Sequence, residues 1–163
     1  MHNISLVSNV DALTAMTEKA KDLGFEVKIL SANIYDTPEE TINNFKNLST
    51  KKNAVLGGGE VKLAVKGGGG SGGRCAHLAL EAVSHLEDND IFIAIASDGM
   101  DNSVAAGAIV DKNTLNKMAE FKLDPQDYLS RYDAYNFFKK TDDLIITGQT
   151  GANVSDLMLW IKQ

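Results

Sequence analysis

Hydrophobic positions recur along the chain with two periods, one typical of helices and one typical of strands. The clearest helix start is Thr37-Pro38, where Thr37 can cap the helix and Glu40 completes a capping box. An earlier helical stripe ends at Gly24. Helices are therefore predicted over residues 10–23, 38–48, 76–83 and 114–121, with two short ones after Pro125 and Asp133.

Alternating or continuous apolar segments predict the strands. They lie over residues 4–7, 25–30, 53–56, 61–65, 91–96 and 144–147. Residues 53–56 and 61–65 are expected to pair as a β-hairpin, because their connection is short and rich in glycine. The unbroken apolar run 91–96 is typical of a central strand covered on both faces. The tail 154–161 is ambiguous, and we favour a strand.

Because strands alternate with helices, the pattern predicts an α/β fold. We expect a three-layer, Rossmann-like domain with a largely parallel mixed sheet and a β-hairpin. The chain has 163 residues and no evident linker or repeat, which predicts one domain over residues 1–163. Ligands of open α/β sheets bind beyond the carboxyl ends of the strands. The loops after Leu56, Ala96 and Thr147 are therefore expected to line one crevice.

Nine of the 14 glycines lie in one stretch of 17 residues, Gly57–Gly73. Glycine loses much chain entropy on folding, so such a run is expected where backbone must come very close to another group. The usual group is a phosphate, held by bare N–H groups and a helix N-terminus. Arg74 follows at the predicted helix start and would add a positive charge. The alternatives are a flexible Gly/Ser linker and an ordinary surface arginine. The run lacks the Gly-Lys-Ser/Thr ending of a P-loop.

Two further loops carry candidate chemistry. Asp98 and Asp101 follow the buried strand 91–96, and carboxylates there suit Mg²⁺ or a base for an alcohol nucleophile. Alternatively, both side chains cap the turn by hydrogen bonds to the backbone. The segment Thr147–Asn153 offers hydroxyl and N–H groups to a ligand, or is an ordinary turn.

Charge and composition narrow the partners. A net charge of −6 disfavours nucleic-acid binding, which needs a basic face, but not a small anionic ligand. No apolar run approaches the roughly 20 residues of a membrane span. The single cysteine, Cys75, excludes an internal disulfide and favours a reducing compartment, so a cytoplasmic location is expected. Its place near a helix N-terminus could lower its pKa, but no histidine partner supports a nucleophile. His77 and His85 lack a third metal ligand.

The order of several motifs resembles one known family. These motifs are Gly58-Gly59-Glu60, Gly72-Gly73-Arg74, Ser97-Asp98-Gly99 with Asp101, Ala105–Asp111, Thr147-Gly148, and Asn153-Val154 followed by Asp156-Leu157. Together they are similar to the MOFRL domain, the C-terminal domain of glycerate 2-kinases, which are sometimes called hydroxypyruvate reductases. The resemblance covers nearly the whole chain.

The resemblance implies a two-domain kinase that transfers the γ-phosphoryl group of ATP to the 2-hydroxyl of D-glycerate with Mg²⁺. Arg74 and Asp98 would be catalytic, and Asp98 with Asp101 would hold the metal. Phosphate, nucleotide or substrate would be bound by Gly58, Gly59, Glu60, Lys66, Gly68, Gly70, Gly72, Gly73, Thr147, Thr150 and Asn153. The partners would be a small anionic substrate and an N-terminal kinase domain in cis or in trans, and a homodimer is possible.

Two departures from the family pattern fall at this site. Gly-Gly-Arg is usually followed by Asn-Gln-Glu, whereas here Cys75-Ala76-His77 follows, and Val104 replaces an acidic residue. These departures favour an alternative, a stand-alone module that binds a phosphorylated metabolite or nucleotide without turnover. Retention of Arg74 and Asp98 favours the kinase. Reductase activity is a weaker option, since no hydride-handling residues stand out.

Overall fold

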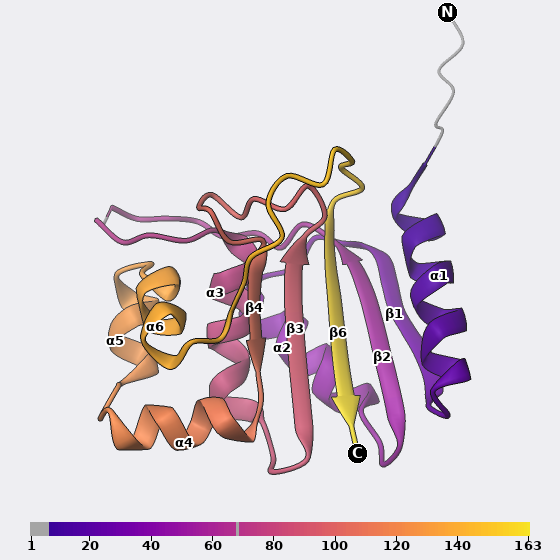
Figure 1. Cartoon of the computed structure of the whole chain (residues 1–163), viewed down its shortest axis with the longest axis horizontal. Coiled ribbons are helices and arrows are strands. Elements are labelled where there is room, and N and C mark those ends of the chain that lie inside the picture. Colours follow the sequence, from indigo (N-terminus) through magenta and orange to yellow (C-terminus); the bar gives the residue numbers. More distant parts are fainter. Residues whose placement is uncertain (1–6, 68) are drawn as a thin grey trace, which may run out of the picture.

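The computed structural model describes residues 7–67 and 69–163, which form a six-stranded mixed sheet with helices packed on it (Figure 1). The strand order is β1-β2-β6-β3-β4-β5. The strands are β1 (Glu26–Ile34), β2 (Asn53–Gly59), β3 (Asp90–Ala96), β4 (Gly107–Val110), β5 (Leu144–Ile145) and β6 (Asp156–Lys162). The strand expected over 4–7 lies outside the described residues except for Val7, which is in a bend.

The predicted helices are all present. They are α1 (Asn9–Asp22), α2 (Pro38–Leu48), α3 (Arg74–Ala82), α4 (Lys112–Glu120), α5 (Pro125–Ser130) and α6 (Ala134–Thr141), and a short 3₁₀ turn, Val83–His85, follows α3. At α2 the Thr37 hydroxyl accepts from the Glu40 backbone N–H at 3.3 Å, and the Glu40 carboxylate accepts from the Thr37 N–H at 3.0 Å. Sequence alone therefore located this cap correctly.

The α/β class and the mixed sheet are confirmed, but the sheet is not largely parallel. Among the described strands only β1 and β2 pair in parallel, and the other four pairings are antiparallel. The cause is β6, the favoured tail strand, which inserts between β2 and β3 and runs antiparallel to both. The parallel arrangement that a Rossmann-like fold implies is therefore confined to one pair.

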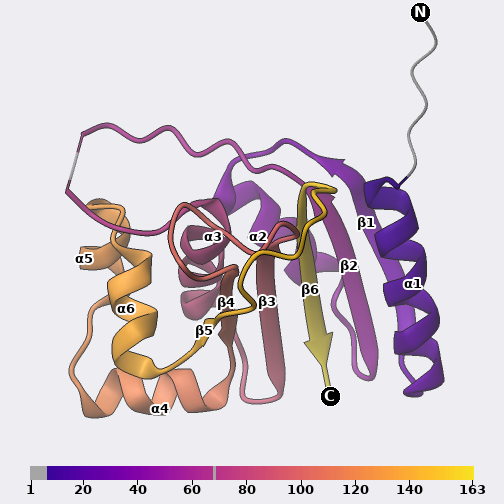
Figure 2. The ribbon, with the colours of Figure 1, turned by 45° about the horizontal axis from the view of Figure 1, so that its top comes forward.

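The expected β-hairpin is also wrong. Residues 61–65 form no strand, because the chain leaving β2 continues beside the end of β1 instead of turning back. The Glu60 N–H donates to the Ile34 carbonyl at 2.9 Å, and the Lys62 N–H donates to the Asp36 carbonyl at 2.8 Å. The segment then crosses the top edge of the sheet toward α5 and α6 before α3 begins (Figure 2).

The two faces of the sheet are covered unequally. The helices α2, α3 and α6 pack together on one face, where Phe92 and Trp160 are fully buried. On the other face α1 covers only β1 and β2, and the front of β6 and β3 is bare (Figure 1). Half-buried aliphatic side chains of β3 and β6 form this open face: Ile91, Ile93, Ile95, Leu157, Leu159 and Ile161. The expectation that residues 91–96 are covered on both faces thus holds for one face within the described chain.

None of the described helices has the length and apolar character that a membrane span requires.

Candidate functional site

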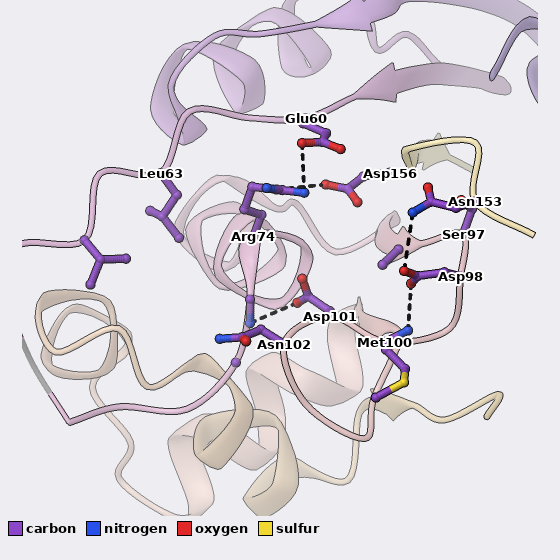
Figure 3. A pocket seen from close by; sticks show the side chains of 14 residues that line it. Glu60, Leu63, Arg74, Ser97, Asp98, Met100, Asp101, Asn102, Asn153 and Asp156 are labelled. Carbon is purple, nitrogen blue, oxygen red and sulfur yellow. Dashed lines mark hydrogen bonds and ion pairs between the residues drawn. The ribbon is translucent and has the colours of Figure 1, made fainter. Parts of the chain in front are cut away.

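A polar pocket of about 360 Å³ lies where β2 and β3 end and β6 begins (Figure 3). The loops after β2 and β3 and the start of α3 form its walls, and Asn153 from the loop before β6 also lines it, so the three predicted loops converge. Seven of the predicted site residues line it: Glu60, Gly72, Gly73, Arg74, Asp98, Asp101 and Asn153. Gly68 lies outside the described residues.

Arg74 is the first residue of α3, and its guanidinium lies between two carboxylates in the pocket (Figure 3). Its Nη2 atom is 3.0 Å from Glu60 Oε2, and its Nε atom is 3.3 Å from Asp156 Oδ2. The side chain is 43% exposed, so part of the guanidinium faces the pocket. The arginine is therefore held by its neighbours and is also accessible to an anion.

Asp101 closes the N-terminus of α3. Its buried carboxylate accepts hydrogen bonds from the backbone N–H groups of Gly73 at 3.2 Å, Cys75 at 3.1 Å and Ala76 at 2.7 Å. Burial raises the pKa of Asp101, although these three donors oppose the rise. The expectation of free N–H groups at this helix end is therefore wrong, since the protein's own carboxylate occupies them.

Asp156 was not among the predicted site residues, although it is central to the pocket. Burial, with a smaller effect from the negative charge of Asp101, raises the pKa of Asp156 to about 6, against the opposing effect of Arg74. Its place in the Asp156-Leu157 motif, at the start of an alternating tail, was the available sequence signal. The local pattern did not show that this tail would enter the middle of the sheet.

Asp98 lies on the turn after β3 and faces the pocket with Asn153 (Figure 3). One carboxylate oxygen accepts from the Met100 N–H at 3.0 Å, and the other is 3.5 Å from the Asn153 amide nitrogen. Together with Glu60, Asp101 and Asp156 it places four carboxylates around the single guanidinium. The described part of this pocket is thus net acidic, and an anion entering it needs additional cations.

Several glycines of the run approach the protein's own chain. A Cβ on Gly59 or Gly70 would lie within 2.5 Å of backbone atoms of Ile34 or of residues 131–132, respectively. A Cβ on Gly58 would meet the Asn9 side chain at 2.0 Å. Gly58 and Gly59 are buried within β2, so neither lines the pocket. These positions require glycine for internal packing, whatever ligand the pocket takes.

The other predicted ligand-binding residues lie beside the pocket. The Thr150 hydroxyl donates to the Ser97 carbonyl at 2.6 Å, and the Thr147 hydroxyl donates to the Gly148 carbonyl at 2.8 Å. The Lys66 N–H donates to the Tyr132 hydroxyl at 3.3 Å on the exposed loop. Thr150 thus ties the loop before β6 to the turn that carries Asp98.

Cys75 and His77 are both buried on α3. Burial, followed by the charges of Asp101 and Asp156, raises the pKa of the Cys75 thiol, so the expected lowering at a helix N-terminus is wrong. Burial lowers the pKa of His77 to about 4, and its ring stacks on Tyr132 with centroids 5.6 Å apart. No group of three or more potential metal ligands occurs among residues 7–67 and 69–163.

The residues of this pocket fall within a region that matches a known family. The model of the MOFRL family matches residues 53–156, which include every described residue lining the pocket. The chain belongs to the MOFRL family. The matched residues therefore include the loops and the helix start that form the pocket, and the four complete strands β2 to β5.

The relatives of this MOFRL chain are longer proteins. D-glycerate 2-kinase of Thermotoga maritima is 36% identical over 96% of this chain and 40% of its own length. Glycerate 2-kinase of Pyrococcus horikoshii is 28% identical over 99% of this chain and 39% of its own length. A crystal structure of glycerate kinase from Thermotoga maritima superposes with a TM-score of 0.89 at 32% identity, covering 96% of this chain and 41% of that one. The chain thus spans about 40% of these relatives, as their C-terminal part.

Proposed function

We propose that this chain is the C-terminal domain of a glycerate 2-kinase and forms one wall of an interdomain site. In that site the γ-phosphoryl group of ATP passes to the 2-hydroxyl of D-glycerate. The observation that carries the proposal is the pocket itself, in which an accessible Arg74 and an accessible Asp98 meet at a sheet edge in a chain of the MOFRL family. Phosphoryl transfer depends mainly on positioning and on neutralising charge, which these groups can supply in part.

The electrostatics of the pocket support a requirement for a second domain. Four carboxylates surround one guanidinium, so ATP or glycerate would meet net negative charge in this domain alone. The missing cations would come from the N-terminal domain, supplied in cis or in trans, and from a metal ion. We therefore expect the isolated chain to have little or no kinase activity.

Two structural features support the placement of that N-terminal domain. The chain enters α1 at the pocket edge, where the Asn9 amide donates to the Val154 carbonyl at 2.8 Å. In the relatives the additional chain precedes this point. The open aliphatic face of β3 and β6 lies on the same side of the sheet as α1 and would be buried by such a domain. The alternative is that a second copy of this chain covers the same face in a homodimer.

Asp98 fits a Mg²⁺ ligand better than Asp101 does. Magnesium commonly takes one or two carboxylates together with substrate phosphates, and Asp98 presents an accessible carboxylate to the pocket. Both oxygens of Asp101 already accept N–H groups from α3. When bound, the metal would neutralise charge on the transferred phosphoryl group. Arg74 would bind that group or the glycerate carboxylate, and Asp98 would orient the reacting hydroxyl or hold the metal.

The alternative function is a stand-alone module that binds a phosphorylated metabolite or nucleotide without turnover. The observation that favours it is the pair of departures at the site: Cys75-Ala76-His77 after Arg74, and an exposed Val104. Cys75 and His77 are buried, so neither presents an accessible polar group to the pocket. Either function would place the protein in the cytoplasm, where ATP and small phosphorylated acids are available.

The experiment supplies the absent domain. The part of the Thermotoga maritima relative that precedes the matched segment is fused ahead of residue 7, and glycerate phosphorylation is assayed. Arg74→Ala and Asp98→Asn should each lower kcat/KM by about 10²-fold or more. Arg131→Ala and Asp127→Asn are matched controls, because these residues form an ion pair and neither lines the pocket. Unchanged kcat/KM in both site variants would contradict the assignment.

Binding measurements separate the two functions. A fusion that binds ATP or glycerate without phosphorylating glycerate supports the binding module, and turnover supports the kinase.

A further inference from the structure

We propose that Asp156 and Glu60 are positioning residues that fix the Arg74 guanidinium across the pocket, and we call these three residues the arginine clamp. The role of the clamp in phosphoryl transfer rests on the proposed kinase function, whereas its geometry and protonation do not. Its two carboxylates come from separate strand ends, and its guanidinium comes from a helix start (Figure 3).

The backbone of the clamp is set by regular structure. Asp156 is the first residue of β6 and is paired with Gly59 of β2 on one side and with Ala96 of β3 on the other. Glu60 directly follows β2, and Arg74 opens α3. The three side chains thus project from fixed points, so the orientation of the guanidinium is set by the sheet edge rather than by a mobile loop.

The two carboxylates contact different nitrogen atoms of the guanidinium. Asp156 Oδ2 lies 3.3 Å from Nε, and Glu60 Oε2 lies 3.0 Å from Nη2. Within the described residues no acceptor is bonded to Nη1, and the Arg74 side chain as a whole is 43% exposed. Holding two nitrogens and leaving the third for a ligand is how a positioned arginine presents a defined hydrogen-bonding edge.

The two carboxylates are not equivalent. The Asp156 side chain is 6% exposed and the Glu60 side chain is 50% exposed. Water screens the Glu60 contact, and exposed ion pairs contribute little. The Asp156 contact lies in a poorly solvated environment, where removing one charge of a pair has a large effect. Asp156 should therefore dominate the orientation of Arg74.

The surroundings make the charge of Asp156 sensitive to pH. The groups that face it are Arg74 and the Cys75 thiol from α3 and Asp101 from the loop after β3, while Glu60 and Asp98 line the same pocket. Burial, and then the Asp101 charge, raise the pKa of Asp156 to about 6 against the pull of Arg74. As pH falls through this value Asp156 becomes neutral, and Arg74 loses the better shielded of its two anionic partners.

A nuclear magnetic resonance experiment on the isolated 163-residue chain tests the clamp without any kinase assay. The Nε–H signal of Arg74, assigned with Arg74→Lys, is followed from pH 7.5 to pH 5. We expect one transition with a midpoint near pH 6, matched by the carboxyl ¹³C signal of Asp156. The transition should vanish in Asp156→Asn and persist in Glu60→Gln, and Arg131 serves as the control arginine.

The outcomes separate a clamp from a purely structural carboxylate. An Arg74 signal that does not move in the wild-type chain, or a transition that survives in Asp156→Asn, would overturn the proposal. If Asp156→Asn does not fold, the wild-type titrations decide alone, because the two signals must share one midpoint.

The kinase consequence is measured separately in the fusion protein. Asp156→Asn should lower kcat/KM by about 10-fold, less than Arg74→Ala, and should remove the component of the acid limb with a midpoint near pH 6. If the unsubstituted fusion does not phosphorylate glycerate, the proposed kinase function is contradicted, but the resonance result for the clamp is unaffected. The wild-type chain could show the resonance transition while Asp156→Asn leaves the pH profile of the kinase unchanged. That result would show that the clamp does not position Arg74 for catalysis.

Discussion

The Oδ2 atom of Asp101 lies 2.7 Å from the backbone nitrogen of Ala76. With the bonds to Gly73 and Cys75, this contact fills the N-terminus of α3 with a carboxylate from the loop after β3. At its C-terminal end the glycine-rich run therefore contacts the Asp101 carboxylate, which belongs to the protein itself. A ligand in the pocket would interact with Arg74 and the loop residues rather than with this helix end.

Removing the Asp101 carboxylate should destabilise the fold. Asp101→Ala leaves three N–H groups at the start of α3 without their acceptor, and we expect a loss of about 2–4 kcal/mol in the free energy of unfolding. Urea unfolding followed by circular dichroism measures this loss. Asp98→Ala is the matched control, since its carboxylate is more exposed, and it should cost less than about 1 kcal/mol. Equal costs would contradict a special role for Asp101.

Two glycines of the same run should respond differently to an added methyl group. A Cβ on Gly73 would lie 2.2 Å from Asp101 Oδ1, whereas a Cβ on Gly69 would meet no atom within 4 Å. Gly73→Ala should lower the free energy of unfolding by about 1–3 kcal/mol, because it displaces the cap. Gly69→Ala should be neutral or slightly stabilising. Thermal unfolding of the two variants side by side measures this difference. If both substitutions were neutral, the whole run would tolerate an added methyl group and the prediction would be wrong.

Neighbouring residues of β6 should reveal the uncovered face. Met158 points into the core and is 1% exposed, whereas Leu159 lies on the open face beside α1. Met158→Gln should cost about 3 kcal/mol or more, and Leu159→Gln about 1 kcal/mol or less. Chemical denaturation of the isolated chain measures both costs, and light scattering measures its mass in solution. A large cost at Leu159 would mean that this face is already covered in solution.

His77 should make the chain sensitive to acid. Its folded-state pKa of about 4 is below the ordinary value of 6.5, so the unfolded chain takes up this proton first as pH falls. Its contribution therefore rises with pH and is lost between about pH 6.5 and 4. The difference in unfolding free energy between His77→Phe and wild type should therefore shift in favour of the variant by roughly 2–3 kcal/mol as pH falls from 7.5 to 4.5.

The control for that measurement is His85→Gln on the neighbouring 3₁₀ turn. Asp156 acts in the opposite direction, because its raised pKa means that the native state binds its proton first between about pH 6 and 3.8. Subtracting the wild-type profile from that of His77→Phe isolates the histidine. A difference that stays constant with pH would refute the buried, neutral imidazole.

The sequence predicted those features that depend on local pattern. The capping box of Thr37 and Glu40 identified the start of α2, and the apolar run 91–96 identified β3. The positions of loops at strand ends also indicated which loops meet, because Arg74 and Asp98 do line one pocket. Each of these inferences uses residues that are close in the chain or that follow a strand end.

The errors arose where distant segments decide the structure. The alternation of residues 61–65 resembled a strand, but the Lys62 N–H donates to the Asp36 carbonyl just after β1 and not to β2. The capping of α3 by Asp101 was not expected, because the approach of this residue to the helix across 25 residues has no local signature. Asp156 was overlooked for the same reason, since only the insertion of β6 brings it beside Arg74.

The central position of β6 has a consequence for biosynthesis. β2 and β3 do not pair with each other, and β6 is the strand that joins them. A nascent chain that has not yet released residues 156–162 from the ribosome holds two separate partial sheets, each with an unpaired edge. Cooperative folding must therefore wait until residues 156–162 are available to pair, and the Arg74 pocket cannot form before then.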